Sequence, residues 1–226
     1  MICRLLFIVG VFVFSSCSSL PEIVTIDTQE LSGINEHCNF PYVAEETQFI
    51  HSIEAVTPGN GKHFMTGITS VFPREEKLES ALLTIEGLVL FHALDDKKGL
   101  VVKRAVPPFD SEGFARGLLE DIRLIFLKPG GSFIKSGRLK NGKSVCRYKR
   151  DDNSVVDIEI DHDNNWGITL YDAGFNQQRS IEATFDREKI ISSEKSIFPA
   201  TIRLRSYALI GYSLRMKLIR AESQSK

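Results

Sequence analysis

The sequence predicts a mainly β protein of the α+β class, in which a curved antiparallel sheet, an incomplete barrel, wraps around one principal helix. Three observations predict this fold: short segments of alternating apolar and polar residues, turn clusters between them, and one mid-chain segment with helical spacing. A sheet cannot bury its own inner face, so the helix is its expected cover. Any part of the concavity that the helix leaves open would form an apolar groove.

The first half of the domain contains four expected strands. They are Gln48–Val56, His63–Phe72, Ser80–Leu94 and Leu100–Val106. Pro58-Gly59-Asn60-Gly61 joins the first two as a dense turn cluster, and the polar residues Asp95 to Gly99 join the last two. Ser80–Leu94 is expected as one long strand, apolar on both faces around Leu88 to Phe91, so both of its faces need cover.

The helix is expected between two strong breakers. Pro107-Pro108 stops the preceding strand, and Asp110 is a plausible N-cap. Apolar side chains then recur at helical spacing until Lys128-Pro129-Gly130-Gly131 ends the run. These side chains are Phe114, Leu118, Ile122, Ile125 and Phe126.

Strands resume after the helix and continue to the C-terminus. The expected segments are Val145–Lys149, Val156–Ile160, Gly167–Tyr171, Ile181–Phe185, Ile202–Arg205 and Tyr212–Leu218. With the four earlier segments this makes ten expected strands and one main helix. No internal repeat or change in composition divides them, so we predict a single half-barrel domain over residues 48–222.

The N-terminus has the pattern of a signal peptide over residues 1–16. Arg4 supplies a positive charge, and Leu5 to Phe14 is an apolar stretch too short to span a bilayer. Cys17 follows small residues, and this arrangement resembles the lipobox of bacterial lipoproteins, although Phe14 stands where that family usually has Leu. The resemblance implies that Cys17 carries a diacylglycerol and an amide-linked acyl chain, and that residues 17–47 are a lipidated tether and irregular lead-in. Ser18 after the cysteine implies the outer membrane, with the domain facing the periplasm.

Composition and motifs exclude several classes of function. With 28 basic and 29 acidic side chains, the chain is a poor nucleic-acid binder. The G-x-S-x-G, H-E-x-x-H and Walker patterns are absent, and two S-x-x-K matches lack companion motifs. Asp161 to Asn165 places Trp166 where a calcium loop needs glycine. We therefore expect no enzyme activity, no cofactor and no metal site.

Two cysteines remain in the mature chain. Cys38 and Cys146 could pair in an oxidising envelope, or could stay as two separate thiols. Neither has the neighbouring cysteine or histidine spacing of a zinc site. The sequence leaves the two alternatives open.

The order of the elements also resembles a known fold. The strand-turn-strand, the helix start at Pro107 to Asp110 and the closing segments Phe198–Leu204 and Gly211–Leu214 resemble the lipoprotein carrier and acceptor proteins of the Lol sorting pathway, over about Gln48 to Ala221. They also resemble an uncharacterised family of envelope lipoproteins. The resemblance implies a half-barrel that holds acyl chains. The Lol acceptor has an exposed hydrophobic loop, whereas the corresponding tip here, residues 95–99, is charged.

Two sets of residues are candidates for binding. The first would line an apolar groove for a lipid or acylated ligand, or would only form the core: Leu88, Leu90, Phe91, Phe114, Leu118, Ile122, Tyr212 and Leu214. The second projects from one face of the last two strands and is either a solvated face or a surface for anionic head groups or an acidic partner: Arg203, Arg205, Arg215 and Lys217. Lipid or lipoprotein trafficking is therefore the first functional hypothesis, and a structural or adaptor lipoprotein is the alternative.

Overall fold

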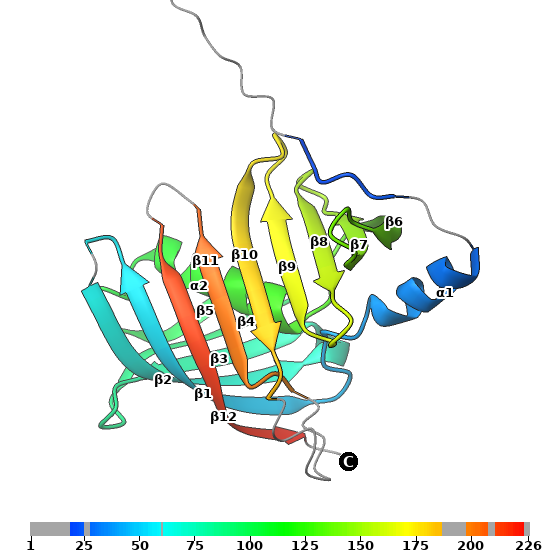
Figure 1. Cartoon of the computed structure of the whole chain (residues 1–226). Helices are drawn as coiled ribbons and strands as arrows, with labels where there is room; N and C mark the ends of the chain where they lie inside the picture. Colours follow the sequence, from blue (N-terminus) through cyan, green and yellow to red (C-terminus); the bar gives the residue numbers. More distant parts are fainter. Residues whose placement is uncertain (1–18, 25–27, 60, 187–197, 208–210, 224–226) are drawn as a thin grey trace, which may run out of the picture.

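The computed structural model describes residues 19–24, 28–59, 61–186, 198–207 and 211–223. The expected signal peptide and Cys17 lie outside these residues. Within them the chain forms twelve strands, two α-helices and one short 3₁₀ helix (Figure 1). In chain order the elements are α1 Thr28–His37, β1 Thr47–Thr57, β2 Gly61–Phe72, the 3₁₀ helix Pro73–Glu75, β3 Lys77–Leu83, β4 Val89–Asp96, β5 Gly99–Ala105, α2 Glu112–Phe126, β6 Ser132–Arg138, β7 Ser144–Lys149, β8 Val155–Ile160, β9 Trp166–Tyr171, β10 Gln177–Thr184, β11 Thr201–Ser206 and β12 Ser213–Ser223.

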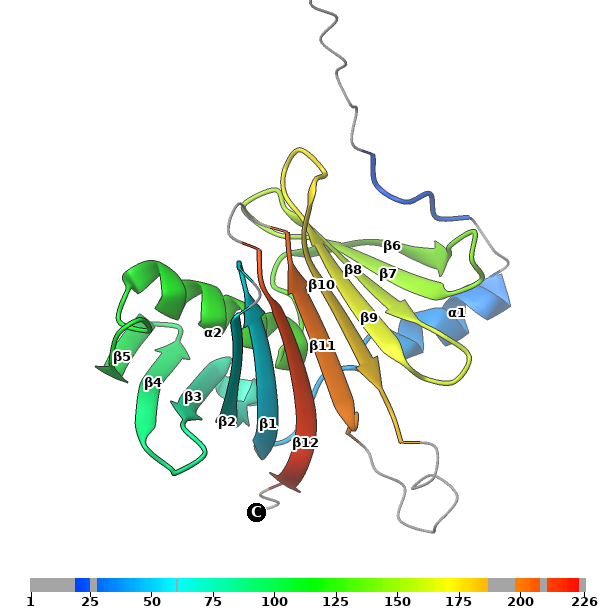
Figure 2. The ribbon, with the colours of Figure 1, turned by 60° about the vertical axis from the view of Figure 1, so that its left-hand side comes forward.

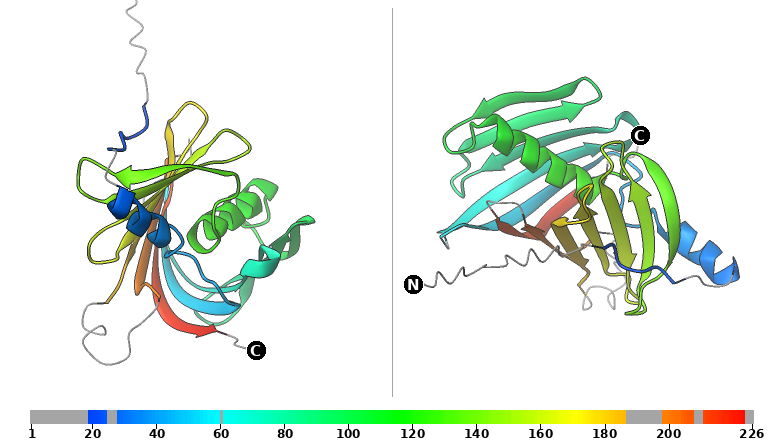
Figure 3. Two further views of the ribbon diagram at one scale, coloured as in Figure 1. Left: turned by 90° about the vertical axis from the view of Figure 1, so that its right-hand side faces the viewer. Right: turned by 90° about the horizontal axis from the view of Figure 1, so that it is seen from above.

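All described strands belong to one antiparallel sheet with the order β5-β4-β3-β2-β1-β12-β11-β10-β9-β8-β7-β6. It consists of two meanders, β1 to β5 and β6 to β12, joined at the centre where the first strand pairs with the last. The consecutive strands β5 and β6 therefore form opposite edges, so the segment between them must cross the sheet. That segment contains α2, which lies across the concave side of the curved sheet (Figures 2 and 3). The predicted fold class, an incomplete antiparallel barrel around one main helix, is confirmed.

Alternation along the strands builds the core between sheet and helix. In β1 the inward residues Phe49, His51 and Ile53 are buried, and the residues between them are more exposed. The apolar face of α2 supplies Leu119 and Ile125, both nearly fully buried. This packing explains why the helical spacing of apolar residues was a reliable signal.

The boundaries of α2 differ slightly from the expectation. Ser111, and not Asp110, is the N-cap, because its hydroxyl accepts a hydrogen bond from the Phe114 amide at 3.2 Å. The helix ends at Phe126, just before the expected breaker Lys128 to Gly131. Gly131 has a φ of +95°. A Cβ atom at this position would lie 2.2 Å from the Lys149 carbonyl oxygen, so the chain needs glycine here to enter β6.

The prediction of one long strand over Ser80–Leu94 is wrong. The chain turns between β3 and β4, where the Thr84 amide donates to the Leu88 carbonyl at 2.9 Å and Gly87 has a φ of +89°. Gly87 is the turn signal in this segment, because its backbone conformation is costly for other residues. The apolar residues around Leu88 were therefore mistaken for one doubly buried strand.

The lead-in and the segment after α2 also differ from the prediction. Residues 17–47 were expected to be irregular, yet α1 covers Thr28–His37 and contacts β6 and β7. Strand β6 itself was not predicted, because the apolar Phe133 and Ile134 are adjacent and a bulge follows between Phe133 and Lys135. An adjacent pair followed by a bulge breaks the simple two-residue period. No helix among the described residues is both long and apolar enough to cross a bilayer.

Candidate apolar site between the helix and the sheet

Four of the expected groove residues meet in one layer between α2 and the sheet. Phe91 of β4 is fully buried, and its ring lies 5.7 Å from that of Phe114 on α2 in an edge-to-face arrangement. Ile122 is buried on the same side of α2, one turn after Leu118. Phe114 and Leu118 are only partly buried, although both pack against the core. The first turns of α2 therefore form a rim at which the apolar layer reaches the surface.

Tyr212 and Leu214 approach the same layer from the C-terminal strand. Leu214 lies opposite Leu204 and Ala55, which are both buried, so its side chain belongs to the inner face of the sheet. Tyr212 is turned inward, because its hydroxyl donates a hydrogen bond to Asp121 on α2. Both residues remain partly exposed.

Leu88 and Leu90 do not belong to this layer. Leu88 lies in the β3–β4 turn with 67% of its surface exposed. Leu90 neighbours the inward Phe91 in β4, and successive side chains of a strand point to opposite faces, so Leu90 lies on the outer face. Two of the expected groove residues are therefore separated from the rest, Leu88 by the turn near Gly87 and Leu90 by its place on the outer face of β4.

A buried polar cluster lies within the otherwise apolar contact between α2 and the sheet. Asp121 is 1% exposed and accepts a hydrogen bond from Arg179 Nε of β10 at 2.8 Å, in addition to the bond from the Tyr212 hydroxyl. Burial raises the pKa of Asp121, while the bonds from Tyr212 and Arg179 act in the opposite direction. Burial and the neighbouring Asp121 also raise the pKa of Tyr212. The cluster fixes the position of α2 over the sheet.

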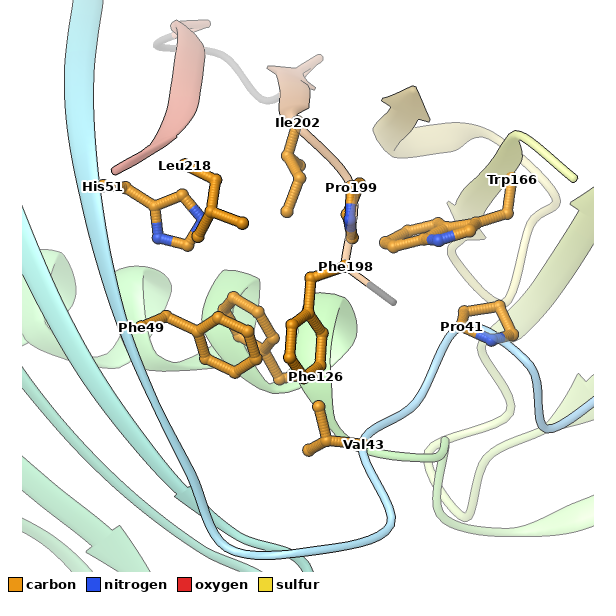
Figure 4. A pocket seen from close by; sticks show the side chains of 10 residues that line it. All are labelled: Pro41, Val43, Phe49, His51, Phe126, Trp166, Phe198, Pro199, Ile202 and Leu218. Carbon is orange, nitrogen blue, oxygen red and sulfur yellow. The ribbon is translucent and has the colours of Figure 1, made fainter. Parts of the chain in front are cut away.

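The apolar space that remains at the C-terminal end of α2 is small. A cluster of aromatic and apolar side chains surrounds a cavity of about 10 Å³ (Figure 4). Phe49 stacks on Phe126 at 4.6 Å and meets the edge of Phe198 at 4.9 Å. A cavity of this size holds at most about one water molecule, so it is too small for an acyl chain. It is lined by Pro41, Val43, Phe49, His51, Phe126, Trp166, Phe198, Pro199, Ile202 and Leu218, and by none of the eight expected residues.

Larger hollows have a different character. One of about 590 Å³ lies beyond the end of α2, where Arg123, Lys128 and Arg150 face Glu76 and Glu120. Another of about 360 Å³ is lined partly by the basic residues of β11 and β12. The first hollow is also lined by apolar side chains, among them Leu124 and Leu127, whereas the lining of the second is mainly polar and charged.

An exposed apolar turn lies elsewhere than the resemblance implied. The β4–β5 tip at residues 95–99 is charged, as expected from the sequence. The β3–β4 turn instead exposes Ile85 and Leu88, with 76% and 67% of their surfaces accessible. The sequence did not predict this turn, because residues 80–94 were expected to form one continuous strand.

The four basic residues predicted on one face of the last two strands are all exposed. Arg203 lies directly opposite Arg215, while Arg205 faces Ser213 and Lys217 faces Thr201. No ion pair joins any of these four side chains to another described residue. Glu182 and Glu54 are the cross-strand neighbours of Arg203 and Arg215.

Cys38, directly after α1, forms a disulfide with Cys146 in β7, and their Cα atoms are 5.8 Å apart. This resolves the alternatives that the sequence left open. The bond attaches the lead-in helix to the β6–β7 end of the sheet.

Sequence reasoning missed Asp121, Arg179 and His51. Asp121 interrupts the apolar helix face next to Ile122, and a carboxylate at such a position is a signal for a buried ion pair. Arg179 carries no comparable signal, because its partner Asp121 is 58 positions away in the sequence. His51 lies on the inward face of β1, and a histidine there gives no sign of the residues around it.

The half-barrel crossed by one helix defines the class of fold, and the comparisons with known proteins agree. The crystal structure of a LolA superfamily protein from Nitrosomonas europaea matches with a TM-score of 0.56 and 8% identity, over 89% of this chain and 96% of that one. This match shows that the chain shares the Lol half-barrel fold, and the resemblance noted from the sequence is confirmed at that level.

Two further structures match more weakly. One is a putative outer membrane lipoprotein-sorting protein domain from Vibrio parahaemolyticus, with a TM-score of 0.48, 8% identity and coverage of 88% of this chain and 94% of that one. The other is a DUF1329 family protein from Desulfovibrio piger, with a TM-score of 0.46, 7% identity and coverage of 88% and 94%. No family model and no curated protein matches the sequence.

Proposed function

We propose that this chain is a lipoprotein of the outer membrane, anchored through Cys17 in the inner leaflet, that binds a lipid or the acyl chains of a lipoprotein between α2 and its sheet. The observation that carries the proposal is the apolar layer between one helix and an unclosed sheet, with partly exposed members such as Leu118 and Leu214 at its rim. The fold shared with a LolA superfamily protein supports it. Binding of this kind requires no catalytic group.

The ligand takes the place of contacts that α2 makes with the sheet. The cavity of about 10 Å³ cannot hold a hydrocarbon chain, so α2 has to move away from the concave face during binding. Each buried CH₂ group contributes about 0.8 kcal/mol, so a long acyl chain can offset the lost contacts. The polar cluster around Asp121 opposes this movement.

The first test measures binding of a fluorescent fatty acid to the purified full chain and analyses co-purified lipids by mass spectrometry. Leu118→Arg places a charge in the apolar rim and should abolish binding while the protein stays folded. Leu88→Arg is the matched control, because Leu88 lies on the exposed turn and the variant should bind normally. Equal binding by both variants, or a chain that neither carries nor binds lipid, contradicts the proposal.

A second variant has the opposite expected effect. Tyr212→Phe removes one hydrogen bond that holds α2 through Asp121. If α2 must separate from the sheet, loss of about 1 kcal/mol of closing energy should increase the affinity about fivefold. An unchanged or weaker affinity would argue against movement of α2.

A second candidate function is an adaptor role for the outer sheet face. Arg203 and Arg215 lie directly opposite each other, and like charges in this position destabilise a sheet. Glu182 and Glu54, the neighbours on the flanking strands, offset part of that cost, and an acidic protein partner would offset more of it. In that case Arg203→Glu with Arg215→Glu should abolish a crosslink formed at this face in cells and leave fatty-acid binding unchanged.

A further inference from the structure

Residues 19–24 are packed against the β6–β7 end of the sheet and are named here the N-terminal strap. The side chain of Arg147 in β7 is held by Asp157 of β8 through two bonds of 2.6 Å, from Nε to Oδ1 and from Nη2 to Oδ2. Arg147 is 6% exposed and Asp157 is fully buried. The same Nη2 atom donates to the carbonyl oxygen of Pro21 at 2.9 Å. A buried, rigidly held guanidinium thus fixes the backbone of the strap.

Two further contacts hold the end of the strap. Ile23 is buried in a small apolar cluster with Leu139 and Val145. The Val24 amide donates to the Arg138 carbonyl at 2.8 Å, and the Arg138 amide donates back at 3.4 Å. Glycine at position 137 makes room for the strap, because a Cβ atom there would lie 2.6 Å from both Ile23 Cγ2 and the Val24 oxygen.

The docked strap limits how far the domain can lie from the membrane. The reasoning rests on the lipid anchor at Cys17 that is part of the proposed function. Pro21 is the fourth residue after Cys17. A fully extended chain covers at most about 3.6 Å per residue, or about 14 Å over these four steps. The surface around Pro21 must therefore lie next to the lipid head groups.

The hairpin next to that surface is rich in basic residues. The β6–β7 hairpin, residues 132–149, contains six lysine and arginine residues and no aspartate or glutamate. They are Lys135, Arg138, Lys140, Lys143, Arg147 and Lys149. Among the described residues, the carboxylates of Glu22, Asp157 and Glu159 pair with Lys140, Arg147 and Lys143. Lys135 and Lys149 are exposed and form no ion pair with another described residue, so they are available to anionic phospholipid head groups.

We propose that the N-terminal strap holds the β6–β7 hairpin against the anionic surface of the membrane that carries the lipid anchor, and so fixes the orientation of the domain. Figures 1 and 2 show residues 19–24 and the β3–β4 turn at opposite ends of the molecule. In this orientation the exposed apolar turn with Ile85 and Leu88 points away from the anchoring membrane.

The test uses the full lipidated chain in vesicles of phosphatidylethanolamine and phosphatidylglycerol that contain a lipid with a spin-labelled head group. A fluorophore is attached to a new cysteine, Asn141→Cys in the β6–β7 turn or Glu86→Cys in the β3–β4 turn. The disulfide leaves Cys38 and Cys146 unreactive. We expect loss of fluorescence at position 141 and unchanged fluorescence at position 86.

Two variants check the cause of the orientation. A flexible Gly-Ser linker of about 12 residues inserted before Ser19 frees the strap from the short span and should remove the difference between the two positions. Lys135→Glu with Lys140→Glu should reduce quenching at position 141. Equal quenching at both positions of the unmodified chain, or stronger quenching at position 86, overturns the proposal.

The anchor and the groove are tested separately. Mass spectrometry of the N-terminal peptide shows whether Cys17 is acylated, and an unmodified Cys17 overturns the orientation proposal. The quenching pattern does not depend on fatty-acid binding under α2. Failure of the groove test therefore leaves the orientation result intact, and the reverse also holds.

Discussion

His51 illustrates how a single residue can link the aromatic layer to the acidity of the medium. Its side chain is 2% exposed and lies beside the stacked rings of Phe49 and Phe126 (Figure 4). Burial lowers the pKa of His51 from 6.5 to about 4. The imidazole is therefore neutral in the folded protein at all but strongly acidic pH.

This pKa predicts a loss of stability in mild acid. Between pH 6.5 and about 4 the unfolded chain binds a proton at His51 that the folded chain does not. The stabilising contribution is thus complete above pH 6.5 and decreases as the pH falls, by about 3 kcal/mol in total. Urea denaturation of the wild type and of His51→Phe, each at about pH 7.5 and about pH 4.5, measures this difference. Equal losses in the two proteins would exclude His51 as the source.

Single residues also show where local sequence information was insufficient. Ser111 and Asp110 are both good N-caps, so the choice between them depends on the backbone geometry before α2. Gly87 was visible as a turn residue, but the apolar residues beside it favoured a continuous strand. The partners of Asp121 are 58 and 91 positions away along the chain, and no local pattern could identify them.

At the scale of elements, one glycine within α2 could be replaced by a larger residue, whereas the glycine between α2 and β6 could not. Gly117 lies within α2, and a Cβ atom there would meet no atom within 4 Å. Gly131 has positive φ and no room for a Cβ atom. The first glycine weakens the helix, and the second is required by the chain path.

The two glycines predict opposite effects of the same substitution. Gly117→Ala should raise the free energy of unfolding by about 0.5 to 1 kcal/mol, because alanine loses less backbone entropy in a helix. Gly131→Ala should lower it by at least about 2 kcal/mol through backbone strain and the clash with the Lys149 carbonyl. Thermal and urea unfolding of both variants measure these changes. A destabilised Gly117→Ala would show that α2 tolerates no added methyl group at the rim.

At the scale of the whole molecule, the disulfide and the strap hold opposite faces of the β6–β7 end. Cys146 points to the inner face, where α1 packs, while its neighbours Val145 and Arg147 contact the strap on the other face. This end is an edge of the sheet and lacks the cover that α2 gives to the centre. Its two attachments compensate for that lack.

The disulfide predicts a large and specific loss on removal. The two cysteines are 108 positions apart, and closing a loop of this size stabilises the folded state by about 4 to 5 kcal/mol in the chain-entropy model. Cys38→Ala with Cys146→Ala should lower the free energy of unfolding by about this amount. A reducing agent should have a similar effect on the wild type and none on the double variant. Equal stability of the two proteins would refute this contribution.

The sequence alone determined the predominance of β-structure, the position of the main helix and the inward faces of most strands, because side-chain periodicity reports burial directly. Only the tertiary structure decided the pairing of β1 with β12, the separation of β5 and β6 to opposite edges, and the small size of the space under α2. The tertiary structure also decided which charged residues pair with each other and that the two cysteines form a disulfide. The physical reason is that strand pairing and packing bring together residues that are distant in the chain. A local pattern predicts whether a residue is buried, but it does not predict which distant residue it contacts.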